Sequence, residues 1–288
     1  MEGRGGKSEC ESRPTRSLVE GGRAVGVETD GGRQIRARPF IASGLNPQQT
    51  FLELFDDADI PAEWRELARD YRYNLLAPLF ATYLNLKAPV RYAAAADCPE
   101  LDQALMVILG LERSEQFLEI VEHHERGTIP PTVMWGACPT RFDPQQAPEG
   151  KHTAFMWEKL PFELAGDASR WDQEKDRHGE QMIQAWQEYA PSLEQNLLGV
   201  TTRSPLDTAR QLPNMRFGDL LVGALTRRQM GFHRPFPGAG HYRGHLPGMY
   251  LCGSSCHPGG NITGMPGYNS AQVLLADLGI KVDWTPPD

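Results

Sequence analysis

Apolar residues follow two periodicities along the chain, and each predicts a different kind of element. After Ser17, short alternating runs separated by the turn dipeptides Gly21-Gly22 and Asp30-Gly31 predict a small antiparallel meander, with one more strand over 40–43. Further extended segments are predicted over 75–86, 132–137, 152–157, 197–202 and 249–252. Helices are predicted over 47–55, 61–71, 99–109, 113–125, 171–189 and 269–278, with a short one starting at Ser204. The mixture predicts an α/β protein whose residues 213–248 are irregular.

The stretch from Gly248 to Gly279 combines a strand, a glycine-rich turn and a helix. Clustered glycines let the backbone approach a ligand with no Cβ in the way, and a helix N-terminus offers unpaired N–H groups to an anion. A phosphate-bearing cofactor fits such a turn. Glycine also serves simply to reverse the chain, so the pattern alone leaves both interpretations open.

Three groups of residues in this stretch keep a distinctive order: Tyr250-Leu251-Cys252-Gly253-Ser254, His257-Pro258-Gly259-Gly260 and Gly264-Met265-Pro266-Gly267-Tyr268-Asn269. This order resembles the C-terminal flavin-binding signature of the phytoene-dehydrogenase-like FAD oxidoreductases, a group that includes the carotenoid desaturases. A less specific similarity extends over Ser17 to Gly279. The resemblance implies the C-terminal part of a Rossmann-type FAD-binding oxidoreductase, with a mixed-sheet α+β substrate domain.

The resemblance also implies a division of the chain. Residues 1–16 are expected to be a disordered or non-native start, 17–50 a residual meander and strand of the FAD domain, 51–245 the substrate domain, and 246–288 the C-terminal FAD-binding segment. In the family, the G-x-G-x-x-G turn that receives the pyrophosphate lies upstream of the meander, and nothing before Ser17 supplies it. We therefore expect a fragment, a truncated gene model, or one half of a split enzyme partnered by a separate N-terminal flavin-binding subunit.

The cofactor implied by the resemblance is FAD, and the implied reaction is hydride transfer from an apolar or unsaturated organic substrate to the flavin. The residues assigned to cofactor contact are Gly253, Ser254, Gly259, Gly260, Asn261, Ile262, Met265, Pro266, Gly267 and Asn269. Relatives often carry a histidine where this chain has Phe217, so no role of that histidine is transferred. The alternative is a non-catalytic regulatory or interaction protein, or a subunit that partners a separate flavin-binding chain.

His257 is the candidate catalytic residue. An imidazole beside a flavin can donate a hydrogen bond to the ring or move a proton, whereas a histidine in a turn also commonly caps backbone groups. Cys252 and Cys256 lack the C-x-x-C spacing of a redox dithiol, and with His257 they do not make a tetrahedral zinc framework. The pair His123-His124 is expected on a solvated helix face. No metal site is predicted.

Composition narrows the class of protein further. The net charge of -8 and the five scattered cysteines argue against a nucleic-acid partner and against a disulfide-built extracellular scaffold. The longest apolar run, 75–86, is interrupted by Pro78 and is too short to span a bilayer. We expect a cytoplasmic protein acting on a small apolar molecule, with the mitochondrial matrix or a peripheral membrane location as alternatives.

Overall fold

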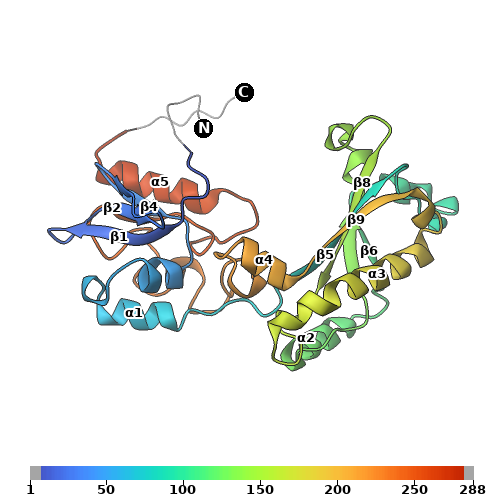
Figure 1. Ribbon diagram of the computed structural model, residues 1–288, viewed down its shortest axis with the longest axis horizontal. Helices are drawn as coiled ribbons and strands as arrows, with labels where there is room; N and C mark the ends of the chain where they lie inside the picture. The colour runs from blue at the N-terminus through green and yellow to red at the C-terminus, as the bar shows by residue number, and fades with distance from the viewer. Residues whose placement is uncertain (1–7, 282–288) are drawn as a thin grey trace. The chain divides into compact units, whose positions relative to one another are not determined.

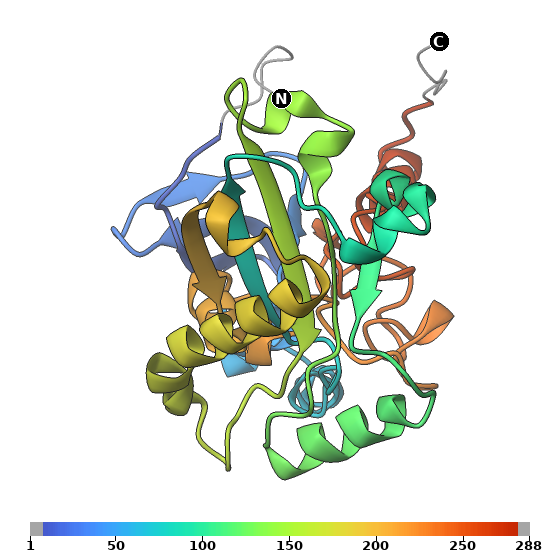
Figure 2. The same cartoon turned by 90° about the vertical axis from the view of Figure 1, so that its right-hand side faces the viewer.

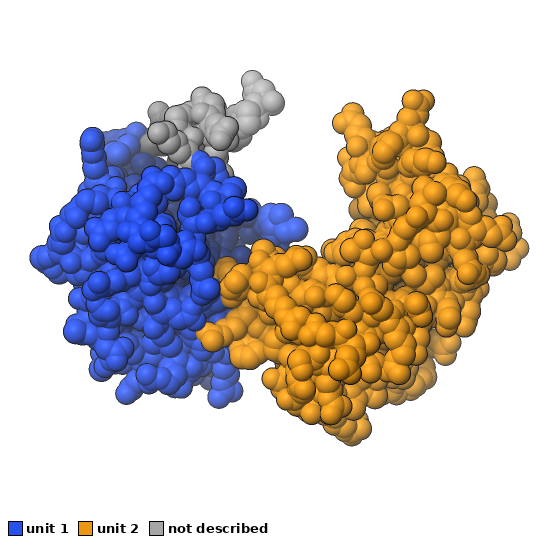
Figure 3. Space-filling model, viewed as in Figure 1, with its two compact units in different colours: residues 1–73, 221–288 blue, residues 74–220 orange. Residues whose placement is uncertain are grey.

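The computed structural model describes residues 8–281, and it divides into two compact units (Figure 3). Unit 1 comprises residues 1–73 and 221–288, and unit 2 comprises residues 74–220. The expected substrate domain of residues 51–245 therefore extends too far at both ends. Residues 51–73 and 221–245 pack in unit 1, because Phe51 and Phe236 belong to one buried core there, with ring centroids 5.7 Å apart.

Unit 1 begins with the expected meander. Its three antiparallel strands, in the order β1-β2-β3, are β1 (Pro14–Glu20), β2 (Arg23–Thr29) and β3 (Gln34–Arg36). The expectation that residues 14–16 are disordered is wrong, because Arg16 pairs with Glu28 in the sheet and forms an ion pair with Asp56. The rest of the expected disordered start falls partly on residues 1–7, which lie outside the described residues.

A parallel strand pair joins the two chain segments of unit 1. Strand β4 (Ile41–Ser43) pairs with β10 (Met249–Leu251), and the register places Tyr250 opposite Ala42. Figure 1 shows β4 between α1 (Ala62–Arg69) and α5 (Met265–Asp277). Between β4 and α1, the helix expected over 47–55 is a π-helical segment, Gln49–Glu53.

Helix α5 begins four residues before the expected start at Asn269. Gly264 takes a left-handed conformation (φ 68°) at the N-cap, and Pro266 lies in the first turn. Proline is tolerated there because the first helical N–H groups have no intrahelical partner, so a Met-Pro-Gly sequence does not delay the helix.

Unit 2 is a five-stranded antiparallel sheet with helices. Its strand order is β6-β7-β8-β5-β9. The strands are β5 (Leu79–Leu86), β6 (Val107–Leu109), β7 (Met134–Ala137), β8 (His152–Lys159) and β9 (Leu197–Arg203), and the helices are α2 (Gln116–Arg126), α3 (Trp171–Tyr189) and α4 (Pro205–Gln211). Figure 2 shows α3 lying across β9, β5 and β8. The predicted bounds of α3 are confirmed.

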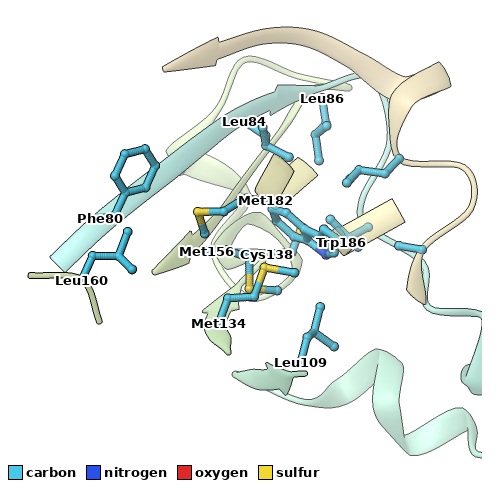
Figure 4. Close-up of a cluster of buried hydrophobic side chains, with 14 of the residues drawn as sticks. Phe80, Leu84, Leu86, Leu109, Met134, Cys138, Met156, Leu160, Met182 and Trp186 are labelled. Atoms are coloured by element: carbon cyan, nitrogen blue, oxygen red, sulfur yellow. The ribbon is translucent and has the colours of Figure 1, made fainter. Parts of the chain in front are cut away.

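The core of unit 2 lies between α3 and the sheet. Met182 and Trp186 of α3 pack with Leu84, Leu86 and Met156 of the strands (Figure 4). A Cβ at Gly179 of α3 would lie 2.3 Å from the Thr202 methyl carbon, so glycine permits the close approach of helix and sheet. Burial of these large side chains contributes roughly 1.5–3 kcal/mol each to the stability of the fold.

Two expectations about unit 2 are wrong. The helix expected over 99–109 is replaced by a 3₁₀ turn, Pro99–Gln103, followed by β6, because pairing of Ile108 with Trp135 in β7 outweighs local helix propensity. The expected solvated His123-His124 face is also incorrect for His124. This side chain is buried and its Nδ1 lies 2.8 Å from the Ile120 carbonyl oxygen, and burial lowers the pKa of its imidazole.

Candidate cofactor site

The parallel pair β4–β10 positions the predicted cofactor segment. The carboxyl ends of parallel strands meet at one edge of a sheet, and the loops after them are where open α/β folds bind ligands. The Cys252 N–H donates to the Ser43 carbonyl oxygen at 2.9 Å, and the Ser255 hydroxyl donates to the Leu45 carbonyl oxygen at 3.4 Å. The fold therefore brings the loop after β4 and the loop after β10 into direct contact.

Two of the predicted glycines are required by the fold itself. A Cβ at Gly253 would lie 2.1 Å from the Gly44 carbonyl oxygen, so the two loops meet only through a glycine. Gly259 has a φ of +112°, and a Cβ there would lie 3.5 Å from Nε of Arg234. Neither residue needs a ligand to explain it.

Two other glycines have no such structural reason. A Cβ at Gly267 would meet only the Cys252 carbonyl oxygen, at 4.0 Å, and one at Gly44 would meet nothing within 4 Å. Both residues have ordinary φ values. Because the fold accepts a side chain at either position, Gly44 and Gly267 are two positions in this region where the absence of a Cβ leaves room for a closely approaching ligand.

A buried arginine, which the sequence did not reveal as a site residue, holds the predicted Ser254. Arg234 is 1% exposed, and its Nη2 donates to the carbonyl oxygen of Ser254 at 2.9 Å. Its two terminal nitrogens also donate to four other backbone carbonyl oxygens, those of Leu221, Val222, Ala224 and Gln229. Hydrogen bonds to several carbonyls compensate a buried guanidinium, so Arg234 fixes the segment after β10 to the loop 221–229.

The loop between Gly259 and Gly264 is strained and exposed, and it contains the predicted Gly260. Asn261 and Ile262 both have positive φ values, 76° and 60°, and the Ile262 side chain is fully exposed. A left-handed conformation is a genuine outlier for a β-branched residue, and such strain is concentrated at ligand-binding segments. An isoleucine in this position is an apolar contact available to a bound group.

The N-terminus of α5 follows this loop directly. The predicted Met265 donates its N–H to the Thr263 hydroxyl at 3.3 Å, Pro266 has no N–H, and no acidic residue lies in the first turn. The helix therefore presents its positive end without a competing carboxylate. Asn269 lies in the second turn and its Nδ2 donates to the Tyr242 hydroxyl at 2.9 Å, so the expectation that it opens the helix is wrong.

His257 lies beside a different part of unit 1. It is exposed, its carbonyl oxygen accepts a hydrogen bond from the Tyr242 hydroxyl at 3.0 Å, and it helps to line a cavity of about 280 Å³. That cavity is also lined by Phe232, His241 and Val273. A catalytic role of His257 stays a prediction.

The two cysteines of the segment are held in their protonated form. Burial raises the pKa of the Cys252 thiol, and it raises the pKa of the Cys256 thiol to about 12. Thiolates are the reactive and metal-binding form, so this environment does not favour redox or metal chemistry. Within residues 8–281, no group of three or more His, Cys, Asp or Glu side chains is arranged to hold a metal ion.

Unit 2 carries an aromatic surface that the sequence pattern did not lead us to expect. On the face of the sheet opposite α3, Trp135 of β7 lies directly across from Trp157 of β8, and Phe155 of β8 lies across from Tyr83 of β5, which is 40% exposed. Ring centroids of Phe155 and Trp157 are 4.6 Å apart. The sequence feature that could have predicted this surface is the alternation in β8. There the half-buried Phe155 and Trp157 lie between the buried residues Ala154, Met156 and Glu158.

One lysine lies on this aromatic surface. Nζ of Lys159 is 5.6 Å from the centroid of the Trp135 ring. Burial lowers the pKa of Lys159, and the nearby charge of Asp219 partly opposes the shift. A partly desolvated ammonium over an indole ring is a favourable cation–π arrangement. The surface is therefore apolar with one cation at its edge.

The fold is that of an α/β protein with a parallel strand pair in one unit and a five-stranded antiparallel sheet in the other. No family model matches the chain. A solved structure of an oxidoreductase from Methanosarcina mazei superposes with a TM-score of 0.53 at 13% sequence identity, covering 96% of this chain and 51% of that one. This likeness shows the fold.

Two curated relatives give the sequence relationship. The chain is 30% identical over 266 residues to pyridine nucleotide-disulfide oxidoreductase domain-containing protein 2 of Rattus norvegicus. The alignment covers 89% of this chain and 45% of the relative. It is 28% identical over 288 residues to a subunit of limonene dehydrogenase from Castellaniella defragrans, covering 95% of this chain and 52% of the relative. The chain is a homologue of these oxidoreductases and matches a C-terminal portion of them. It spans about half the length of the curated relatives it matches.

Among the described residues, no helix has both the length and the apolar composition that a membrane span requires.

Proposed function

We propose that the chain supplies the substrate-binding unit and the C-terminal cofactor segment of an FAD-dependent oxidoreductase, in which a hydride passes from an apolar organic substrate to the flavin. The observation that carries the proposal is the ligand edge of unit 1. There the loops after β4 and β10 meet at Gly44 and Gly253, and the chain continues through a strained loop into the N-terminus of α5, whose first turn has no acidic residue.

The residues of this edge fit the proposed cofactor. Gly44 and Gly267 leave the backbone open to close approach, and the N-terminus of α5 attracts an anionic or electron-rich group. Arg234 fixes Ser254 in place, so the backbone of the segment is positioned before a ligand arrives. The exposed Ile262 would cover an apolar surface of the bound group. FAD, when bound, supplies the hydride-accepting chemistry, and the protein supplies orientation and electrostatics.

Unit 2 supports the proposed substrate class. The surface of Trp135, Phe155, Trp157 and Tyr83 is large, rigid and apolar, as a site for an unsaturated hydrocarbon-like molecule requires. In this proposal the rings bind and orient the substrate by apolar contact, and its reacting carbon needs no charged group of the protein.

The proposal is tested by titrating the purified chain with FAD and following flavin fluorescence and the visible spectrum. We expect saturable, stoichiometric binding. Gly267→Ala and Gly44→Ala would weaken it by about tenfold or more, since a methyl group displacing a closely packed ligand costs on the order of 1–3 kcal/mol.

The matched control is Gly31→Ala, in the β2–β3 turn. A Cβ there would also meet nothing within 4 Å, and its φ is likewise ordinary. The control variant should bind FAD like the natural chain and all three variants should keep their thermal stability. If the Gly44 and Gly267 variants bound FAD as tightly as the natural chain does, a cofactor contact at this edge would be contradicted. The absence of flavin binding by the natural chain would contradict it too.

A second candidate function follows from the outer edge of β4. Alternate residues of a parallel strand bond to the same neighbour, and Ile41 and Ser43 bond towards β10, so the N–H and C=O of the exposed Ala42 point away from it. The far edge of β10 is already occupied, because the Leu251 N–H donates to the Tyr242 carbonyl oxygen. An extended segment of another chain can therefore add to β4 by main-chain hydrogen bonds, which suits a subunit that partners a separate flavin-binding chain.

The two candidates are separated by the oligomeric state of the flavin-binding species. If the isolated chain binds FAD as a monomer, the first proposal holds without a partner. If binding appears only when a dinucleotide-binding chain is co-expressed, and proline substitution at Ala42 prevents co-purification while Ala42→Ser does not, the partner proposal holds.

A further inference from the structure

Unit 1 contains a second cavity, which shares no residue with the cofactor segment. Its volume is about 620 Å³, within the ~300–1,000 Å³ usual for small-molecule sites. Four of its lining residues are arginines: Arg69 at the end of α1, Arg72 just after that helix, and Arg227 and Arg228 in the loop 221–229. This concentration of positive charge contrasts with the net charge of -8 of the whole chain.

No acidic side chain of the described residues neutralises the four guanidinium groups. Among residues 8–281, none of them forms an ion pair with a carboxylate, and the one acidic side chain lining the cavity is Asp70. Arginines are permanently charged, so four in one cavity repel each other unless solvent or an anion lies between them. Several other described arginines of unit 1 form ion pairs with carboxylates, as Arg36 does with Glu20 and Arg243 with Asp277.

A purely structural role accounts for only one of the four. Arg69 lies in the last turn of α1, where a cation interacts favourably with the helix dipole. The other three lie outside the helix, and their side chains make no hydrogen bond within the described residues. Helix capping therefore leaves most of the charge in the cavity unexplained.

The cavity is built on a fixed framework. Gln229 is buried, its Nε2 donates to the Arg72 carbonyl oxygen at 2.9 Å, and its Oε1 accepts from the Arg72 N–H at 2.9 Å. The Tyr71 hydroxyl donates to the Val222 carbonyl oxygen at 2.7 Å. These bonds hold the two arginine-bearing segments side by side. The buried Phe236, together with Leu67 and Pro237, adds an apolar part to the lining.

We infer that this cavity binds the phosphate group of an organic phosphate, with the guanidinium groups on the phosphate and the apolar lining on the attached organic part. Guanidinium groups recognise phosphate oxygens through paired, charge-assisted N–H donors. The volume is far larger than a single phosphate ion needs, and the apolar residues have no use in holding a bare ion. Two kinds of ligand carry a phosphate group attached to an organic part: a soluble organic phosphate and a phospholipid headgroup.

Arg234 connects this cavity to the cofactor segment. Its side chain donates to the carbonyl oxygens of Ala224 and Gln229, which flank the two loop arginines, and also to that of Ser254. A phosphate that orders the loop 221–229 would therefore act on the same buried side chain that holds the segment after β10.

The test measures binding of ADP and inorganic pyrophosphate to the full chain by calorimetry, with adenosine as the neutral comparison. Sedimentation with phosphatidylglycerol and phosphatidylcholine vesicles examines the lipid source. We expect binding of ADP or of the anionic vesicles, with none of adenosine or neutral vesicles. The double variant R227Q/R228Q should weaken that binding by at least about tenfold, and Arg72→Gln should weaken it independently. Arg38→Gln removes an exposed arginine of the same unit that does not line the cavity, and it should have no effect.

Each outcome either identifies the kind of phosphate ligand or overturns the inference. Arginine-dependent ADP binding identifies a soluble phosphate, and arginine-dependent vesicle binding identifies a lipid headgroup. No binding to either, or binding that R227Q/R228Q leaves unchanged, overturns it. A loss of FAD affinity in R227Q/R228Q as large as the loss of ADP affinity would assign the cavity to the flavin and also overturn a second site. Because all four arginines are exposed, the variants should fold normally, which circular dichroism checks.

Discussion

The two units hold themselves together by different means. Unit 2 packs one face of a continuous sheet on α3, and its largest buried side chains are apolar, such as Met156 and Trp186. Unit 1 joins chain segments from both ends of the sequence through a short parallel pair, and its buried groups include Arg234 and Asn46. The comparison teaches that the apolar unit exposes a surface of side chains, where we propose substrate binding, whereas the polar unit exposes backbone groups, where we propose cofactor binding.

The largest expected effect distinguishes the two faces of the unit 2 sheet. Trp186→Ala, on the α3 face, should lower the free energy of unfolding by about 3–5 kcal/mol, because it leaves a cavity in a closed core. Trp157→Ala, on the opposite face, should cost only ~1 kcal/mol, since the ring is half-buried. Urea denaturation of both variants measures the difference. Equal losses would mean that the aromatic face is as closed as the core, and so unsuitable as a substrate surface.

The next effect concerns the polar core of unit 1. Arg234→Met should lower the free energy of unfolding by about 2–4 kcal/mol, because five backbone carbonyl oxygens lose their buried donor. Arg38→Met, at an exposed position of the same unit, is the control. Hydrogen exchange of the loop 221–229 and of Ser254 should accelerate in the first variant alone. Unchanged exchange there would show that Arg234 does not hold the cofactor segment.

A smaller effect depends on pH and involves the half-buried His245 of unit 1 and the buried His124 of unit 2. Burial lowers the pKa of His245, which is enclosed by Phe51, Phe55 and Trp64, and burial likewise lowers that of His124. The unfolded histidines gain a proton near their ordinary pKa of 6.5 while the folded ones stay neutral. Stability from this source is present above pH 6.5 and is lost as the pH falls through that value towards the lower folded pKa.

Thermal unfolding between pH 8 and pH 5 measures this dependence. His245→Phe should reduce the loss of stability in unit 1 on acidification, because phenylalanine preserves the aromatic packing and cannot be protonated. A natural-like pH dependence in that variant would exclude His245 as its source. His123→Gln, at the half-buried neighbour of His124, is the matched control in unit 2 and should leave the dependence intact.

The smallest effect is on thiol reactivity. Cys10 and Cys98 are exposed and should react with a thiol reagent at pH 8 within minutes, whereas Cys256, with a pKa of about 12, should react only as fast as unit 1 opens. Mass spectrometry of the labelled peptides gives the rates. Rapid labelling of Cys256 in the folded chain would contradict its buried environment and reopen a redox role for the pair with Cys252.

The same contrast explains what the sequence could predict. In unit 2 the apolar period of 3.6 over 171–189 and the alternation over 152–157 determine α3 and β8, because each element buries one face along its length. The helix prediction over 99–109 was wrong because β6 is stabilised by its pairing with β7. Local sequence propensity carries no information about that contact. The sequence analysis did not predict the aromatic face, although the alternation of aromatic residues with other residues in β8 indicated it.

Unit 1 was harder to predict because its decisive contacts are distant in sequence. The sequence pattern predicted the meander and the strand before Gly253. No pattern in the neighbouring sequence indicates that Arg234 is buried or that Ala42 lies opposite Tyr250 in the strand pair. The family signature predicts a cofactor segment, and the structure places that segment as one continuous stretch of unit 1. It could not separate Gly253, which the packing against Gly44 requires, from Gly267, which the fold does not require.

The most direct test of the cofactor assignment is hydrogen exchange of the chain with and without saturating FAD. We predict slower exchange in the loop 44–46 and in the segment 253–267, with α3 of unit 2 unchanged. Unchanged exchange in both unit 1 segments, or protection confined to unit 2, would contradict the central claim that the loops after β4 and β10 form a flavin site.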